Sequence, residues 1–177
     1  MTRTQLEHIL RAASRVAETR DVMVIGSQAI LGSYADDELP DEAIGSIEVD
    51  LWFRDDPADE KADLVDGAIG ELSAFHDTFG VYAQGVSSTT ATLPSGWESR
   101  LVILDNEATA PGRAFCLEPH DLVASKLAAG RGKDHDFAEA LLRAGIVDAE
   151  VLSERIDQLP VPRMRRDQLH AWISAHR

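Results

Sequence analysis

The segment from residue 22 to residue 53 constrains the fold most strongly. It begins with an apolar run at 22–25, breaks at Gly26-Ser27, continues with small residues at helical spacing, and ends in a β-prone run that contains Glu48 and Asp50. Alternate residues of a strand project to the same face, so the two acids are expected to point the same way. The segment predicts a strand, a tight turn into a helix, and a return strand with paired carboxylates.

This order of residues favours phosphate and metal chemistry. Gly26 lets the backbone turn sharply and approach a ligand, and Ser27 can cap the helix and offer its hydroxyl, while the free N–H groups of the helix N-terminus favour an anion. The oxygens of Glu48 and Asp50 suit a magnesium ion that also binds triphosphate oxygens. Each half also has a plain structural interpretation, as a turn with its cap and as a solvated acidic face.

The rest of the first two thirds of the chain mixes helical and β-prone stretches. Apolar residues recur at helical spacing over 4–19 and again from Pro57 to about residue 73. Short β-prone runs, separated by glycine and proline, lie at 81–83, 89–93, 101–104 and 114–117. The order predicts a mixed α/β fold in which helices flank a mixed sheet with several antiparallel strands.

From Pro119 onward the pattern is helical. One helix is expected after Pro119, another from Lys133, and two further amphipathic stretches on either side of residues 160–162. We therefore expect an α/β core over residues 1–117 and a helical part over 118–177 that packs on it.

Charge is distributed unevenly along the chain. The net charge is −14, and residues 36–63 alone carry twelve acids against two basic residues. A nucleic-acid binder normally needs a basic footprint, so the balance argues against a broad nucleic-acid surface. Residues 126–177 carry nine basic residues against eight acids, which leaves a local basic face open, densest at Arg163, Arg165 and Arg166.

The remaining bulk features indicate a cytoplasmic protein. No apolar run approaches the roughly 20 residues that cross a bilayer, which excludes a membrane partner, and the N-terminus has no signal-peptide core. Cys116 is the only cysteine and lies in an apolar run, so a buried structural thiol is expected rather than a nucleophile.

With these motifs the chain resembles the polymerase-beta-type nucleotidyltransferase superfamily, in which Gly-Ser opens a helix and a strand bears a carboxylate-x-carboxylate pair. It is most similar to the small bacterial branch related to the abortive-infection and MenT-type toxin nucleotidyltransferases. That branch has a helix lysine followed by a Lys/Arg-Asp pair, matched here within residues 120–137 by Lys126 and by Lys133-Asp134. The resemblance covers roughly residues 20 to 145.

The resemblance implies a metal-dependent enzyme that moves a nucleoside monophosphate from a nucleoside triphosphate to an acceptor. Glu48 and Asp50 would bind Mg²⁺ or Mn²⁺, and Gly26, Ser27 and Lys126 would bind the phosphates. Asp134 would act beside Lys126. The acceptor implied is tRNA, a protein hydroxyl or a small molecule, and an antitoxin is an implied protein partner.

The sequence departs from the superfamily pattern in two places. Glu48 stands where Asp is usual, and its extra methylene moves the metal-binding oxygens about one bond length outward. An acidic insert over residues 36–42 lengthens the connection between Ser27 and Glu48, which costs little closure entropy. Two alternatives therefore stay open: a nucleotide-binding module without turnover, and a toxin–antitoxin component whose acidic surface a basic partner covers.

Three further residues have competing interpretations. Asp105, at the end of a β-prone run, is either a third carboxylate that deprotonates the acceptor or a turn former. Arg100 either reaches a triphosphate or is exposed, with exposure favoured. His135 has no partner at metal-ligand spacing and is expected to be structural.

Overall fold

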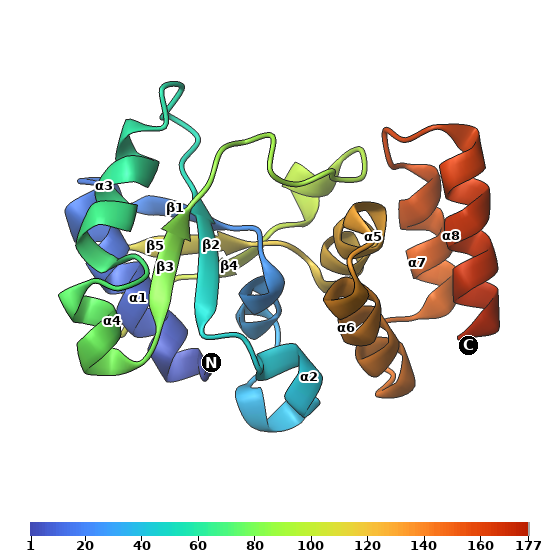
Figure 1. Ribbon diagram of the computed structural model, residues 1–177, viewed down its shortest axis with the longest axis horizontal. Coiled ribbons are helices and arrows are strands. Elements are labelled where there is room, and N and C mark those ends of the chain that lie inside the picture. Colours follow the sequence, from blue (N-terminus) through green and yellow to red (C-terminus); the bar gives the residue numbers. More distant parts are fainter. Residues whose placement is uncertain (177) are drawn as a thin grey trace.

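A computed structural model describes residues 1–176. Its five strands form one mixed sheet in the order β3-β2-β1-β5-β4 (Figure 1). Strand β1 pairs antiparallel with β2 and parallel with β5, while β3 is parallel to β2 and β4 is antiparallel to β5. The strands are β1 (Asp21–Val24), β2 (Glu48–Trp52), β3 (Tyr82–Gly85), β4 (Val102–Leu104) and β5 (Arg113–Cys116). The predicted mixed α/β fold is confirmed.

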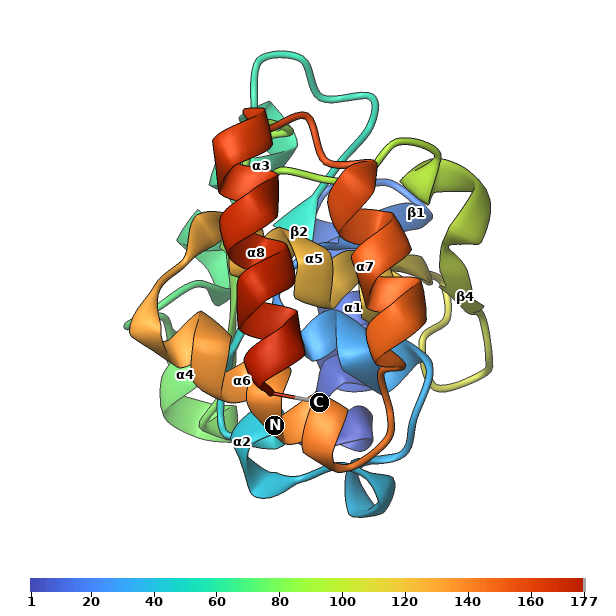
Figure 2. The same ribbon diagram turned by 90° about the vertical axis from the view of Figure 1, so that its right-hand side faces the viewer.

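Helices lie on both sides of this sheet. On one side are α1 (Arg3–Val16), α3 (Glu60–Ile69) and α4 (Ala74–Phe79), and on the other are α5 (Pro119–Ala129), α6 (Gly132–Arg143), α7 (Ala149–Asp157) and α8 (Arg163–Ala175) (Figure 1). Figure 2 shows α7 and α8 side by side and outermost, in front of α5. Between β1 and β2 the chain forms η1 (Ser27–Gly32), η2 (Asp36–Glu38) and the short α2 (Asp41–Ile44), and η3 (Trp97–Arg100) precedes β4. None of the helices within residues 1–176 is long and apolar enough to span a membrane.

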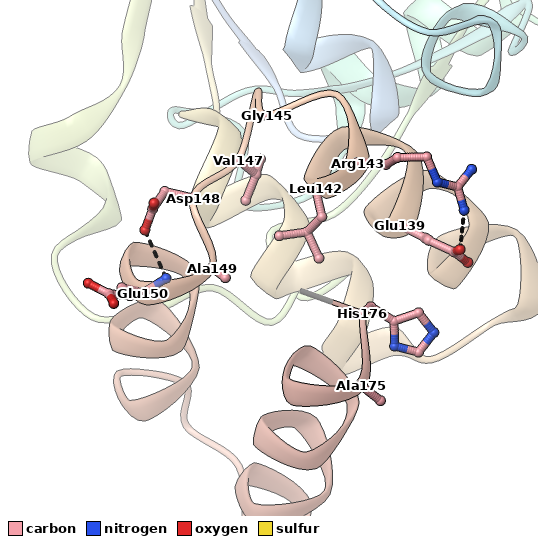
Figure 3. Close-up of a pocket in the computed structure, with 10 residues that line it drawn as sticks. All are labelled: Glu139, Leu142, Arg143, Gly145, Val147, Asp148, Ala149, Glu150, Ala175 and His176. Carbon is pink, nitrogen blue, oxygen red and sulfur yellow. Dashed lines mark hydrogen bonds and ion pairs between the residues drawn. The ribbon is translucent and has the colours of Figure 1, made fainter.

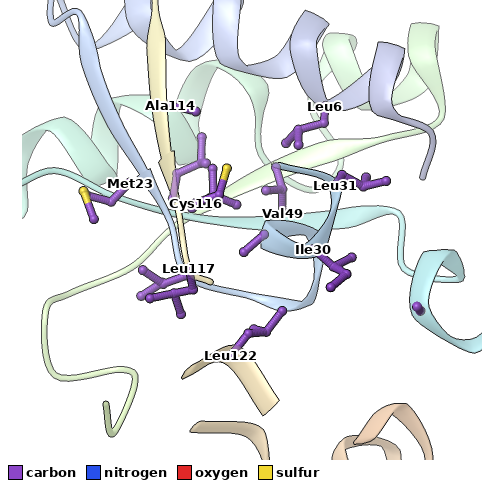
Figure 4. Packing of buried hydrophobic residues seen from close by; sticks show 14 of the residues in the cluster. Leu6, Met23, Ile30, Leu31, Val49, Ala114, Cys116, Leu117 and Leu122 are labelled. Atoms are coloured by element: carbon purple, nitrogen blue, oxygen red, sulfur yellow. The ribbon is translucent and has the colours of Figure 1, made fainter. Parts of the chain in front are cut away.

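The hydrophobic core extends from the sheet into the C-terminal helices. Figure 4 shows Leu6 of α1, Val49 of β2, Cys116 of β5 and Ile30 of η1 in one buried cluster, which continues to Leu122 of α5. All five side chains are buried. A boundary between a core and a helical part near residue 117 stays a prediction, since the buried cluster runs across it.

Three local predictions are wrong. The run at 89–93 is not a strand: its threonines are exposed, and it lies in the loop between β3 and η3. The helix expected to reach residue 73 ends at Ile69, because Gly70 leaves the helical conformation and Leu72 takes a positive φ of 63° before α4 begins. The helix after Gly26 is a six-residue 3-10 helix, and Gly26 rather than Ser27 occupies its cap position.

Asp121 of α5 is an ionic junction between three elements. Its carboxylate is fully buried, accepts two hydrogen bonds from Arg100 of η3 at 2.8 and 2.9 Å, and lies 3.3 Å from Nε of Arg155 on α7. Arg100 is therefore neither a free surface residue nor directed at a triphosphate. The junction ties the loop before β4 to the helical layer.

We expect Asp121→Asn to lower the free energy of unfolding by about 3 kcal/mol, because it leaves two largely buried guanidinium groups without their counter-charge. Urea denaturation followed by circular dichroism measures this loss. The matched control is Asp167→Asn, which removes the exposed ion pair to Arg163 on α8 and should cost less than about 0.5 kcal/mol. Equal losses for the two variants would contradict the prediction.

Candidate active site

The two acids of β2 lie on one face of their strand. Glu48 and Asp50 are partly accessible, whereas Val49 and Leu51 between and after them are fully buried on the other face. Strand alternation thus directs both carboxylates toward the side of the sheet that carries α5 and α6. The predicted acid pair is present as a pair.

Gly26 lies directly against Asp50. A Cβ atom added to Gly26 would stand 1.8 Å from Oδ2 and 2.9 Å from Cβ of Asp50, so no larger residue fits without displacing that side chain. The close approach follows from the antiparallel pairing of β1 and β2, in which the N–H of Ile25 donates to the carbonyl of Asp50 at 3.2 Å. The turn after β1 and the acid pair on β2 therefore meet.

A cavity of about 710 Å³ opens beside this contact. Its walls come from η1, β2, the end of β3 and the helices α5 and α6, and they include Ser27, Glu48, Asp50, Lys126 and Asp134. These are the residues predicted from the sequence, except Gly26, which touches the cavity through Asp50. Segments that are separated by about one hundred residues in the chain thus converge on one space.

Asp134 holds two cations at the cavity wall. Its carboxylate is 1% exposed and lies 3.4 Å from Nζ of Lys126 and 2.7 Å from Nε of Arg131. Burial raises the pKa of Asp134, but the hydrogen bond from Arg131 and the charge of Lys126 outweigh it, so the pKa is lowered overall. Asp134 is therefore an anion that orients both cations, whereas Asp136 is exposed.

The pKa of Asp50 in the acid pair is shifted in the opposite direction to that of Asp134. Burial raises the pKa of Asp50, and the neighbouring charge of Glu48 raises it further, while Lys126 opposes the shift. Two carboxylates at close quarters repel each other unless a cation lies between or beside them. Lys126 lines the same cavity, and its positive charge lowers the pKa of Asp50, which partly offsets this repulsion.

Tyr82 contacts one acid of the candidate site, a contact that the sequence did not reveal. Its hydroxyl donates a hydrogen bond to Oε2 of Glu48 at 2.8 Å from the adjacent strand. Burial and this hydrogen bond raise the pKa of Tyr82 to about 12. The only signal was the β-prone run around it, and the pairing of β3 with β2 was needed to bring it to Glu48.

The donor set fits a divalent cation of the magnesium type. Within residues 1–176 no group of three or more His, Cys, Asp or Glu side chains could hold a metal, so Glu48 and Asp50 would act with few protein ligands. Mg²⁺ is commonly bound in this way, through one or two carboxylates together with waters and substrate phosphates. Among the described residues, the cavity wall contains no Cys, Met or His side chain, and this disfavours zinc.

A second cavity, of about 770 Å³, lies where α6, α7 and the end of α8 meet. Its described lining has no pair of strand carboxylates facing a lysine. Figure 3 shows that its polar side chains pair locally: Arg143 with Glu139, and Asp148 with the N–H of Glu150. The ring of His176 is hydrogen-bonded to the carbonyl of Trp172 at 2.7 Å. The candidate site is therefore the cavity beside β2.

A family model described as "Nucleotidyltransferase of unknown function (DUF6036)" matches residues 4–172. The chain belongs to this family. None of the curated proteins and none of the solved structures matches it. Membership in a nucleotidyltransferase family confirms the general class that the Gly-Ser and acid-pair motifs indicate, while the link to abortive-infection and MenT-type toxins stays a prediction.

In this nucleotidyltransferase, Asp105 lies away from the cavity. It forms an ion pair with Arg20 at 2.9 Å, and Arg20 precedes β1, whereas Gly26 follows β1. The four residues of β1 separate the two ends by roughly 13 Å. The third-carboxylate interpretation is wrong, and Asp105 instead directly follows β4, before the turn at 107–111.

The remaining side chains singled out in the nucleotidyltransferase sequence have structural surroundings. Cys116 is fully buried, and burial raises its pKa to about 12, as expected of a structural thiol. His135 packs 5.3 Å from the ring of Trp172. In the basic cluster, Arg165 donates to the carbonyl of Leu127 at 2.8 Å, so it links α8 to α5 rather than lying on a free basic face.

Proposed function

We propose that this chain is a divalent-metal-dependent nucleotidyltransferase that transfers a nucleoside monophosphate from a nucleoside triphosphate to an acceptor hydroxyl. The observation that carries the proposal is the meeting of Gly26, the acid pair and Lys126 around one cavity. Family membership supports the reaction class. The metal, the substrates and the roles of individual residues are parts of the proposal.

In the proposed reaction, the acceptor hydroxyl loses its proton to water and its oxygen bonds to the α-phosphorus. The bond from that phosphorus to the bridging oxygen breaks, and pyrophosphate leaves. Mg²⁺ or Mn²⁺, when bound, would polarise the phosphate oxygens and neutralise their charge. Glu48 and Asp50 would hold the metal from one face of β2. Catalysis would come chiefly from positioning and electrostatic stabilisation.

The phosphates would lie between η1 and α5. The hydroxyl of Ser27 lines the cavity and can donate to a phosphate oxygen, while the backbone of Gly26 permits close approach. Lys126 and Arg131 would offset the negative charge, held in place by Asp134. Because η1 is a short 3-10 helix, the side chains and cations carry more of this binding than a helix dipole does.

A second candidate function is a nucleotide-binding module without turnover. The longer Glu48 side chain in place of Asp is the observation that favours it. For an active enzyme, the acceptor would be tRNA, a protein hydroxyl or a small molecule. The acidic stretch 36–63 would suit a basic protein partner such as an antitoxin, a proposal that co-purification from the native operon tests.

A label-transfer experiment tests the proposal. The purified protein is incubated with Mg²⁺ or Mn²⁺, total RNA and cell lysate, and each nucleoside triphosphate labelled in turn at the α- or the γ-phosphate. We expect label from the α-position to join an acceptor and label from the γ-position to leave as pyrophosphate, with EDTA abolishing both. If the protein binds a nucleoside triphosphate but transfers label from none of the nucleotides, the result would favour a nucleotide-binding module without turnover.

A further inference from the structure

The side chain of Glu48 is held from the neighbouring strand. Strands β2 and β3 run parallel, and their register places Tyr82 directly opposite Glu48. From that position the Tyr82 hydroxyl donates to Oε2 of Glu48 at 2.8 Å. The other carboxylate oxygen, Oε1, accepts no hydrogen bond from Tyr82. The negative charge of Glu48 raises the pKa of Asp50.

The contact depends on the length of glutamate. An Asp at position 48 would withdraw the carboxylate by about 1.5 Å, one carbon–carbon bond, and so would move it out of hydrogen-bond range of a phenol now at 2.8 Å. Conversely, a Glu without a partner has one more rotatable bond than Asp and loses more freedom when a metal fixes it. Tyr82 supplies the constraint that the longer side chain needs.

The phenol itself is supported from behind. The ring of His76 on α4 lies 4.8 Å from the ring of Tyr82, centroid to centroid. His76 is fixed in turn, because its Nδ1 accepts the backbone N–H of Leu72 at 3.1 Å. The hydroxyl therefore stands on a packed ring rather than on a free surface side chain, and it can act as a fixed donor.

We propose that Tyr82 is a positioning residue that orients Glu48 for metal binding and compensates for the glutamate that replaces the usual aspartate. The inference rests on the proposed function, because it requires that Glu48 and Asp50 bind a divalent cation. Residues that orient a metal-binding side chain commonly change metal affinity by ten- to a hundredfold when they are removed. Tyr82 is expected to act in the same way.

Mn²⁺ binding, measured by electron paramagnetic resonance without nucleotide, tests the inference through a double-mutant cycle. We expect Tyr82→Phe to weaken Mn²⁺ binding about tenfold. The affinity of Glu48→Asp is the reference for the second pair, and adding Tyr82→Phe to it should change nothing further, because the shorter carboxylate does not reach the phenol. An equal loss in both backgrounds, or no loss in either, would overturn the inference.

Two control variants distinguish failure of the inference about Tyr82 from failure of the proposed function. Tyr34→Phe removes the hydroxyl of the other tyrosine in the chain and should leave Mn²⁺ binding unchanged. Asp50→Asn should abolish it. If Asp50→Asn abolishes Mn²⁺ binding while Tyr82→Phe binds as the unmodified protein does, only the role of Tyr82 is refuted. If Asp50→Asn binds Mn²⁺ normally, both the metal site and the inference are refuted. Melting temperatures of all variants verify that each is folded.

Discussion

Asp50→Asn is expected to reduce nucleotidyl transfer by about 10³-fold, which is the largest effect on activity that we predict. The amide keeps the size of the side chain but removes the charge that would hold the metal beside Glu48. The same change should leave the protein as stable or slightly more stable, since burial and Glu48 both disfavour the charged carboxylate. Loss of activity without loss of stability is characteristic of a site residue.

The measurement is the initial rate of α-phosphate transfer at saturating nucleotide, together with the urea denaturation midpoint. Asp105→Asn is the matched control, because that carboxylate lies at the far end of the sheet in a surface ion pair with Arg20. It should retain full activity. An Asp50→Asn protein that still transfers at more than a tenth of the normal rate would refute the proposed role of the acid pair.

Much of the candidate site could be predicted because its parts depend on local rules. The alternation of side chains along a strand is enough to place Glu48 and Asp50 on one face. The turn at Gly26 needs only an apolar run that ends in glycine and serine, and consecutive strands of one sheet usually pair or lie next to each other. Lys126 is different, because nothing in the neighbouring sequence distinguishes it from a helix lysine that faces solvent. Only the resemblance singled it out.

The residues that the sequence did not reveal depend on long-range pairing. Tyr82 meets Glu48 because β3 pairs with β2 in one particular register, and a shift by a single residue would turn its side chain to the other face. Arg100 was expected to be exposed because its partner, Asp121, lies on a later helix. Arg131 precedes α6, and its guanidinium reaches Asp134 in the first turn of that helix. Such contacts follow from tertiary packing and leave no periodic trace.

The failed strand at 89–93 shows the limit of β propensity. Threonine favours strands because it packs well on a half-buried pleated surface, not because of its backbone alone. Here Thr89 and Thr90 are exposed, and the hydroxyl of Thr89 lies 2.8 Å from that of Ser87 within the loop. Thr90 instead lines the candidate cavity. A run that reads as a strand thus forms a loop beside the site.

Gly26→Ala is expected to reduce transfer by at least about 10²-fold without changing any charge. The φ of −85° at Gly26 suits alanine, so the backbone itself opposes nothing. The new methyl would instead overlap Asp50, lying 1.8 Å from Oδ2 and 2.7 Å from Cγ, and the whole carboxyl group must move aside. Displacement of a catalytic group by about 1 Å is enough for a loss of this size.

The control for this variant is Gly67→Ala in α3. That glycine is exposed, and a Cβ there would meet no atom within 4 Å, so alanine should stabilise the helix by up to about 1 kcal/mol and leave transfer unchanged. Transfer rates, Mn²⁺ affinity and urea midpoints are compared across both variants. Because Gly26→Ala moves Asp50 rather than removing it, Mn²⁺ affinity should fall together with activity while the fold persists. Normal activity in Gly26→Ala would mean that the contact between the turn and the acid pair is not part of the catalytic site.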